Sequence, residues 1–307
     1  MDSNPPFFII GNPRSGTTLL RLMLTCHPNI CVPPEGGFVI RFLNSFGNFS
    51  GSKAETEAFV KELSRVPKME YWNLDSEALE EFILKEKASN YANLCSCVYR
   101  WYATQMGKKN AVIWGDKNNY YLNHIDKLAD LFPKGKFLHI VRDGRDIACS
   151  YRKLRNVKGK YAPELPTSLV TAAKHWKNNI KVIRNSLKKI NSSLVFELKY
   201  EDLVTKPQPV LSKVCDFLGV AYDSSMLNYS KKNKDKALEP EDFDDWKKLN
   251  KKELTNSRIN LWKTEMFDED IYHFQRICGQ ILSTYGYDLI PFELKDKVRF
   301  NFTTLLK

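Results

Sequence analysis

Short apolar runs alternate along the chain with longer segments in which apolar residues recur at helical spacing. Five runs are typical of buried strands: Phe7–Ile10, Ile30–Val32, Ala111–Trp114, Phe137–Val141 and Leu194–Leu198. Because strands that alternate with helices form β-α-β units, we expect the strands to pair in parallel. The pattern predicts an α/β fold: a parallel β-sheet flanked by helices on both faces, in a single domain with helical additions.

Two helical segments are especially regular. Between residues 166 and 190, seven apolar residues recur at alternating spacings of four and three, from Leu169 to Ile190. A second segment begins at the acidic run Asp268–Asp270, which favours a helix N-terminus, and stops at Gly286. Residues 46–106 are also mostly helical in pattern. Residues 231–253 are mostly charged, which predicts an exposed loop or short surface helix that could act as a lid.

The first strand runs directly into the loop Gly11–Thr18 (GNPRSGTT), and a helical pattern begins at once after it. In a strand–loop–helix of this kind, backbone N–H groups and the helix N-terminus converge on one anion. The glycine spacing is that of a nucleotide P-loop, but Thr17 stands where an NTP-binding loop has its lysine. Arg14 offers a planar fork suited to one tetrahedral anion. The loop therefore predicts a phosphate site, in a P-loop-like fold, that is not built for ATP.

Polar side chains also follow the other predicted strands. They are Glu35 after the second, Asp116 and Lys117 after the third, Arg142 and Arg145 after the fourth, and Tyr200 after the fifth. Because the carboxyl ends of parallel strands meet at one sheet edge, these groups should line one pocket for an anionic ligand. Arg142 and Ser150, on the helix that follows, could share a second phosphate. The alternative is a surface ion pair of Asp146 with Arg142 or Arg145.

The 307 residues carry a net charge of +11, which favours anionic partners. Charge alone does not choose among nucleic acid, a membrane surface and a polyanionic small molecule. We see no Arg-rich tail or RNA-reading motif, so we expect no nucleic-acid partner. No apolar run reaches the length of a membrane span.

The seven cysteines are scattered and form no CxxC pair, which predicts reduced thiols and no zinc site. The chain does not open on the basic and apolar pattern of a signal peptide. Together these features favour a soluble, cytoplasmic protein. They leave its oligomeric state open.

Two motifs, in this order, carry a family resemblance over most of the chain. PRSGTTLL at residues 13–20 resembles the 5′-phosphosulfate loop of the sulfotransferases that use 3′-phosphoadenosine 5′-phosphosulfate. FLHIVRDGRDIACSY at residues 137–151 resembles their 3′-phosphate motif, with Arg142 and Ser150 at the matching places. YEDL at residues 200–203 is also similar. The spacing from Arg14 to Glu35 resembles that in the subgroup that includes tyrosylprotein sulfotransferases. The neighbours of Glu35 depart from the pattern of this subgroup, with Pro33-Pro34 before it and Gly36-Gly37 after it.

The resemblance implies sulfuryl transfer to a hydroxyl acceptor, with adenosine 3′,5′-bisphosphate as the product and no metal. It implies that Glu35 is the general base and that Arg14 and Lys117 stabilise the leaving phosphate. It further implies a cofactor-binding set. This set comprises Arg14, Ser15, Gly16, Thr17, Thr18, Arg142, Ser150, Tyr200, Ser257 and Arg258.

Plainer interpretations stand beside these roles. Glu35 could cap the next helix, Lys117 could pair with Asp116 or another acid, and Tyr200 could be a core aromatic instead of an adenine contact. His27, His124 and His139 are candidate bases by residue type, but a structural or surface role is expected for all three.

Two other functions remain open from the sequence. A P-loop kinase would need a lysine at position 17 and a magnesium-binding carboxylate, for which Asp116 is the candidate. A non-catalytic nucleotide-binding module would need the phosphate sites but no base. The acceptor itself is not named by any residue. For the domain organisation, we expect a sulfotransferase domain at residues 1–290 and a tail at 291–307 that packs on it or trails from it.

Overall fold

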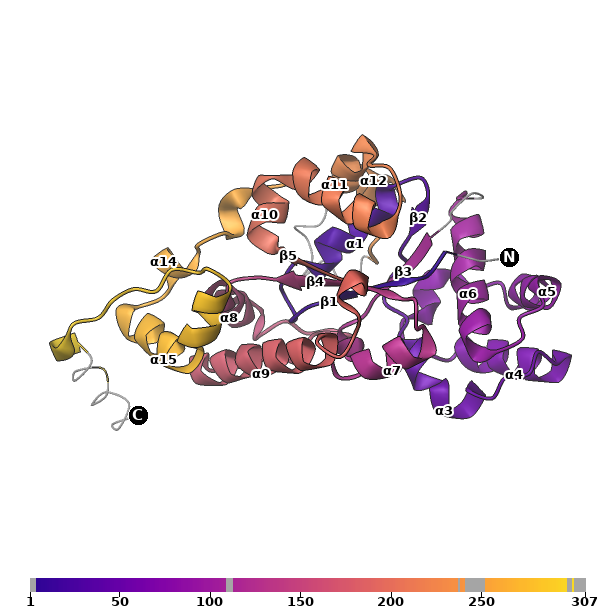
Figure 1. Cartoon of the computed structure of the whole chain (residues 1–307), viewed down its shortest axis with the longest axis horizontal. Coiled ribbons are helices and arrows are strands. Elements are labelled where there is room, and N and C mark those ends of the chain that lie inside the picture. Colours follow the sequence, from indigo (N-terminus) through magenta and orange to yellow (C-terminus); the bar gives the residue numbers. More distant parts are fainter. Residues whose placement is uncertain (1–3, 109–112, 237, 241–251, 297–299, 301–307) are drawn as a thin grey trace.

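The computed structural model describes residues 4–108, 113–236, 238–240, 252–296 and 300. Five strands form one sheet: β1 (Phe7–Ile10), β2 (Ile30–Cys31), β3 (Ile113–Lys117), β4 (Lys136–Val141) and β5 (Val195–Lys199). Their order is β2-β3-β1-β4-β5, and every adjacent pair is parallel. The predicted α/β fold, a parallel sheet with helices on both faces, is confirmed (Figure 1).

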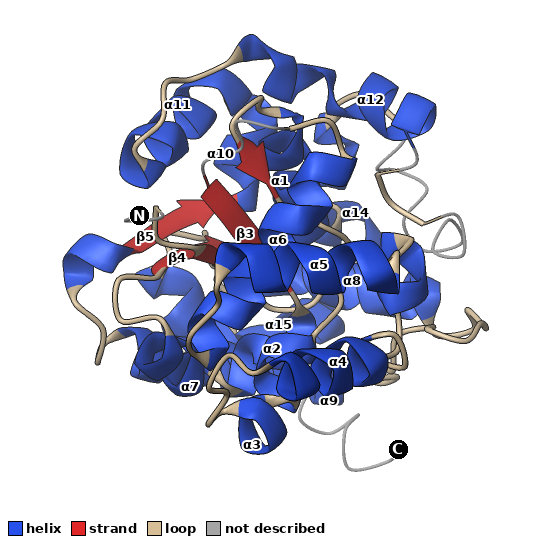
Figure 2. Ribbon diagram, turned by 90° about the vertical axis from the view of Figure 1, so that its right-hand side faces the viewer, coloured by secondary structure: helices blue, strands red, loops and turns tan. Residues whose placement is uncertain are grey.

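Helices occupy both sides of the sheet and most of the connections between strands (Figure 2). Those described before β4 are α1 (Thr17–Cys26), α2 (Phe38–Arg41), α3 (Leu43–Phe46), α4 (Lys53–Leu63), α5 (Ser76–Glu86), α6 (Tyr91–Gln105) and α7 (Ile125–Leu131). Those after it are α8 (Gly144–Leu154), α9 (Leu169–Leu187), α10 (Tyr200–Thr205), α11 (Pro207–Leu218), α12 (Tyr229–Lys236), α14 (Trp262–Glu265) and α15 (Asp268–Thr284). Among the short 3₁₀ helices are η1 (Met69–Trp72) and η7 (Asn256–Arg258).

The central strand β1 shows how its sequence builds the two layers. Alternate residues of a strand point to opposite faces. Phe7 and Ile9 pack in the core that α1 and α11 cover, whereas Phe8 and Ile10 pack in the core shared with α4–α7 and α9. In Figure 1, α1, α10 and α11 accordingly lie on one side of the sheet and α7–α9 on the other. A third core joins α8, α9 and α15.

The predicted strands agree with the structure to within a few residues, and β3 differs most. The strand continues to Lys117 instead of ending at Trp114, so Asp116 and Lys117 belong to the strand. Pairing with β1 explains the extension, because Phe7 lies opposite Gly115 and Ile9 opposite Lys117. A Cβ at position 115 would meet the Phe7 ring at 2.4 Å, so only glycine fits there. Residues 111 and 112 lie outside the described part of the chain.

The regular helices were also predicted closely. The segment 166–190 is α9 at Leu169–Leu187, and its apolar stripe is buried, while Lys174, Lys181 and Lys188 face solvent. The segment that starts at Asp268 is α15, which ends at Thr284. All seven cysteines lie in the described part of the chain, are buried and form no disulfide. Within the described residues, no helix is long and apolar enough to cross a membrane.

The prediction of an exposed segment at residues 231–253 is wrong for its middle. Leu238, Glu239 and Pro240 are buried, and Glu239 forms an ion pair with Arg21 of α1. A guanidinium buried inside a helix layer needs a carboxylate to compensate its lost hydration, which draws this charged segment inward. Residues 241–251 lie outside the described part, so the predicted lid stays a prediction. The division at residue 290 also stays one; Phe292 packs against Tyr272 of α15.

Candidate functional site

A cavity of about 550 Å³ opens where the carboxyl ends of β1, β3, β4 and β5 meet. Its walls carry Arg14, Glu35, Lys117, Arg142, Ser150 and Tyr200. The sequence separates these residues widely, and the parallel sheet brings them to one edge. The fold therefore places these six residues around a single pocket, as the sequence predicts for them.

The loop after β1 is shaped by two residues in the left-handed region. Gly16 has φ +94°, and a Cβ there would lie 2.5 Å from the Tyr200 ring, so a side chain is excluded on both grounds. Arg14 has φ +73°, a conformation that costs a non-glycine residue energy and is often retained at functional sites. The helix α1 starts at Thr17, so its positive N-terminal end faces the cavity.

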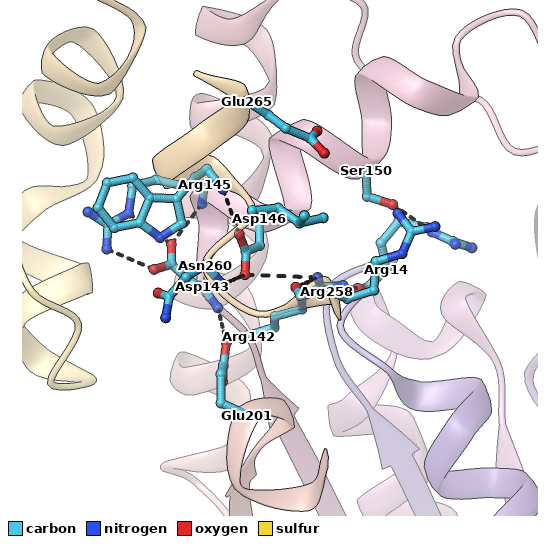
Figure 3. Close-up of polar contacts among 12 residues, drawn as sticks. Arg14, Arg142, Asp143, Arg145, Asp146, Ser150, Glu201, Arg258, Asn260 and Glu265 are labelled. Carbon is cyan, nitrogen blue, oxygen red and sulfur yellow. Dashed lines mark hydrogen bonds and ion pairs between the residues drawn. The ribbon is translucent and has the colours of Figure 1, made fainter. Parts of the chain in front are cut away.

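Arg14, Arg142 and Arg258 meet beside this loop, close to Ser150 (Figure 3). Together with Ser150 and Tyr200, which also line the cavity, they form what we call the arginine cluster. The Arg14 Nε donates to Ser150 Oγ at 3.2 Å. The Arg142 Nη1 donates to the Arg14 carbonyl at 3.0 Å, and its Nη2 donates to the Arg258 carbonyl at 2.5 Å. The Arg142 guanidinium also lies over the Tyr200 ring, 4.4 Å from its centroid. Arg14 and Arg142 thus lie on one side of the sheet edge, in contact with each other.

The arginine cluster has an excess of positive charge. Burial, together with the nearby charges of Arg142 and Arg258, lowers the pKa of Arg14 to about 10. The Arg142 Nε is buried and has no hydrogen-bond partner among the described residues. An anion that binds between these groups would reduce the repulsion among the cations and would give the unpaired donor an acceptor. The cluster is therefore suited to bind phosphate groups.

The predicted surface pairs of Asp146 are replaced by buried contacts. Arg142 Nη2 lies 4.0 Å from Asp146 Oδ2, but both side chains are buried. Arg145 pairs with Asp143 instead, through Nε at 3.0 Å and Nη2 at 2.7 Å. Its guanidinium lies 3.6 Å from the centroid of the Trp262 ring and is no part of the cavity wall. Arg145 therefore serves packing, and Arg142 alone of the two faces the cavity.

A second group of charges, the glutamate cluster, comprises Glu35, Lys117 and Lys68. Glu35 is 7% exposed and Lys117 2% exposed, and their side chains form an ion pair through Glu35 Oε1. Lys68 Nζ lies 2.6 Å from Glu35 Oε2. Glu35 does not cap α2, whose N-cap is Gly37. Each carboxylate oxygen instead meets one ammonium group, at the wall of the same cavity as the arginine cluster.

The carboxylate beside Lys117 has a different environment. Asp116 is buried on the other face of β3 and accepts hydroxyl hydrogen bonds from Tyr99 at 2.5 Å and Tyr121 at 2.6 Å. Burial raises the pKa of Asp116 to about 6. It does not line the cavity, so Lys117 pairs with Glu35 and not with its neighbour.

The comparisons with known proteins agree with this geometry. The model of the sulfotransferase family matches residues 5–224, which is most of the chain. The chain belongs to the sulfotransferase family. It is 24% identical to the nodulation protein NoeE of Sinorhizobium fredii over 92% of the chain and 65% of that protein. It is 27% identical to protein-tyrosine sulfotransferase 2 of Gallus gallus over 73% of the chain and 54% of that protein. The chain thus spans only part of the length of these relatives.

A solved structure supports the same membership. The sulfotransferase domain of the Synechococcus PCC 7002 olefin synthase is 25% identical, with a TM-score of 0.63, over 94% of this chain and 96% of that one. The sulfotransferase domain from the curacin biosynthetic pathway shares the fold, with a TM-score of 0.60 at 22% identity over 94% of this chain and all of that one.

Within this sulfotransferase-family chain, the remaining predicted residues divide into two groups. Gly16, Thr17, Thr18 and Arg258 line the cavity. Ser15 is a buried residue of the loop, and Ser257 is exposed on η7; neither lines the cavity.

The three histidines have other partners. His27 Nε2 lies 2.8 Å from the Ala221 carbonyl, and His139 Nδ1 lies 2.8 Å from Glu197. The His124 ring packs against Tyr120. None of the three lines the cavity.

The sequence analysis missed Lys68 and Tyr161. Lys68 has φ +76° and precedes η1, and its backbone N–H donates to the Tyr161 hydroxyl at 3.2 Å. Tyr161 and Lys160 both contact Glu70, at 2.6 and 2.8 Å, and so hold residues 160–164 against η1 as a wall of the cavity. No motif marks these residues, because they come from connections without regular periodicity.

Proposed function

We propose that the chain is a sulfotransferase enzyme that moves a sulfuryl group from 3′-phosphoadenosine 5′-phosphosulfate to a hydroxyl acceptor. The observation that carries this proposal is the shared cavity. An arginine cluster suited to phosphates and a buried glutamate between two lysines line its walls together. A nucleotide-binding module without catalytic activity would need only the arginine cluster.

The arginine cluster would hold the nucleotide. Arg14, Thr17, Thr18 and the first turn of α1 would bind the 5′-phosphosulfate, since they combine a helix N-terminus with hydroxyl and guanidinium donors. Arg142 and Ser150 would bind the 3′-phosphate, for which the unpartnered Arg142 Nε is a donor. Tyr200 packs on Gly16 and carries Arg142 on its ring, which makes it a wall of the nucleotide site.

The glutamate cluster would act on the acceptor. The bound donor supplies the sulfuryl group and a phosphate leaving group. Glu35 accepts the proton of the acceptor hydroxyl, and its lysine partners fix the carboxylate in one orientation. Lys117 and Arg14 stabilise negative charge that develops at the leaving phosphate. Tyr120, 47% exposed, and Tyr161 give the acceptor region aromatic surface.

The kinase alternative loses its candidate carboxylate. Asp116 lies beneath two tyrosine hydroxyls, away from the cavity, so it cannot reach a metal ion bound with a nucleotide there.

Calorimetry and mass spectrometry test the proposal together. Adenosine 3′,5′-bisphosphate should bind without Mg²⁺ and more tightly than ATP. With the sulfuryl donor and a panel of phenols, alcohols, sugars and tyrosine peptides, at least one acceptor should gain the mass of one SO₃. Tight, Mg²⁺-dependent ATP binding would overturn the proposal. Bisphosphate binding without turnover on any acceptor would leave only the binding module.

A further inference from the structure

Asp146 is a buried carboxylate to which none of the roles above applies. It lies in the first turn of α8, is 1% exposed, and does not line the cavity. Its Oδ2 accepts the backbone N–H of Asn260 at 2.9 Å, and its Oδ1 accepts the backbone N–H of Trp262 at 3.1 Å. Both amides belong to a segment more than a hundred residues away in sequence, so Asp146 joins two distant parts of the chain (Figure 3).

The segment that Asp146 holds forms part of the nucleotide site. Residues 253–255 and Arg258 line the cavity directly before this point. Asn260 has φ +59°, a left-handed conformation that asparagine adopts more readily than most non-glycine residues. Trp262 is buried with its ring against the Arg145 guanidinium, which anchors the far end of the turn. The two hydrogen bonds to Asp146 therefore fix the path of the chain between the cavity wall and α14.

Arg142 holds the same turn from the other side. Its Nη2 donates to the Arg258 carbonyl at 2.5 Å and lies 4.0 Å from Asp146. Arg142 thus binds a carbonyl of the turn while Asp146 binds two of its N–H groups, and the two side chains attract each other. Since burial raises the pKa of Asp146 only to about 6, the group is ionised at neutral pH and keeps this attraction.

We propose that Asp146 is a positioning residue that couples occupation of the Arg142 site to closure of residues 252–262 over the nucleotide. The inference rests on the proposed function, because it takes the 3′-phosphate as the anion at Arg142. Asp146 orients the Arg142 fork and fixes Arg258 at the cavity wall. A 3′-phosphate that binds Arg142 then stabilises the closed turn, and the closed turn strengthens the binding of that phosphate.

The test compares Asp146→Asn with wild type in two measurements. The first is the ratio of the dissociation constants of adenosine 5′-monophosphate and adenosine 3′,5′-bisphosphate, which isolates the gain from the 3′-phosphate. We expect the variant to lower this ratio about tenfold, the effect of losing roughly one hydrogen bond to a charged group. The second is hydrogen exchange at residues 252–262. The bisphosphate should protect them in wild type and much less in the variant.

Asp116→Asn is the control for the loss of a buried carboxylate. Asp116 is also 1% exposed, but it accepts its hydrogen bonds from Tyr99 and Tyr121, away from the 252–262 segment and from the cavity. Its variant should keep both the ratio and the protection, whatever its effect on the melting temperature. Asn260→Ala provides a second variant that leaves the core intact, because Asn260 is exposed. The loss of its favourable left-handed conformation should change the ratio in the same direction as Asp146→Asn.

The outcomes are distinguishable from failure of the proposed function. If wild type binds both nucleotides equally, the assignment of Arg142 to the 3′-phosphate is wrong. If wild type prefers the bisphosphate but Asp146→Asn keeps the full preference and protection, Asp146 does not position the site. An equal loss of affinity for both nucleotides would show a structural role and would also overturn the inference.

Discussion

The arginine cluster and the glutamate cluster line the same cavity but are built in different ways. In the arginine cluster, Arg142 follows β4 directly and Arg14 lies in the loop after β1. Arg142 donates to two backbone carbonyls, and Arg14 donates to the Ser150 hydroxyl. In the glutamate cluster, Glu35, Lys68 and Lys117 come from three separate segments, and ion pairs join their side chains. Strand ends and the loops after them place Arg14 and Arg142, whereas the packing of separate connections brings Glu35 and Lys68 to Lys117.

The two clusters also differ in their charge balance. The arginine cluster keeps an unpaired buried donor on Arg142, and burial together with the neighbouring cations lowers the pKa of Arg14 to about 10. The glutamate cluster pairs each oxygen of Glu35 with a lysine. The first cluster thus has a donor left for an anion, whereas both oxygens of the carboxylate in the second already have a lysine partner. The clusters should therefore respond to mutation separately, one in nucleotide affinity and the other in turnover.

We expect Glu35→Gln to separate turnover from nucleotide affinity most strongly. The amide keeps the size of the side chain but cannot accept the acceptor proton, so kcat should fall about 10²–10⁴-fold. Affinity for adenosine 3′,5′-bisphosphate should stay within about twofold, a change of under ~0.5 kcal/mol. Steady-state kinetics and calorimetry on the same preparation measure both. Turnover near the wild-type rate would remove Glu35 from the mechanism.

Arg142→Gln should give the opposite pattern. It removes the guanidinium that we assign to the 3′-phosphate, and charge-assisted hydrogen bonds are worth ~1.5–3 kcal/mol each. Affinity for the bisphosphate should fall about 10²–10³-fold, and affinity for adenosine 5′-monophosphate much less. Calorimetry with both nucleotides measures the difference. Equal losses for the two would place the 3′-phosphate elsewhere.

The same contrast explains what the sequence could predict. Local patterns predict the parallel sheet, the loop at Arg14 and the pair Arg142–Ser150. Strand ends and glycine spacing depend on residues that are close together in the sequence. Lys68 and Tyr161 carry no such pattern, since only packing of η1 against residues 160–164 brings them to the site. The burial of Glu239 was missed for a related reason: its partner Arg21 lies more than two hundred residues away.

A pH titration tests the buried acid behind the glutamate cluster. Burial raises the pKa of Asp116 from 3.8 to about 6, so the folded protein binds this proton more tightly than the unfolded chain. The free energy of unfolding should therefore fall as pH rises from about 4 to about 6, by at most about 3 kcal/mol from this group. Asp116→Asn should flatten that fall in denaturant titrations across the range. Parallel curves for the two proteins would contradict it.

The smallest change in activity is expected for Lys68→Met, which tests most directly whether the two clusters act independently. Lys68→Met removes one of the two ammonium groups on Glu35 but leaves Lys117 in place. The carboxylate keeps its charge and loses one orienting contact, worth ~1.5 kcal/mol, so kcat/KM should fall about tenfold. Nucleotide affinity should not change, because Lys68 contacts Glu35 and Tyr161, which we assign to the acceptor region and not to the nucleotide. Kinetics beside calorimetry decide the point: a loss of nucleotide affinity would mean that the two clusters act as one coupled site.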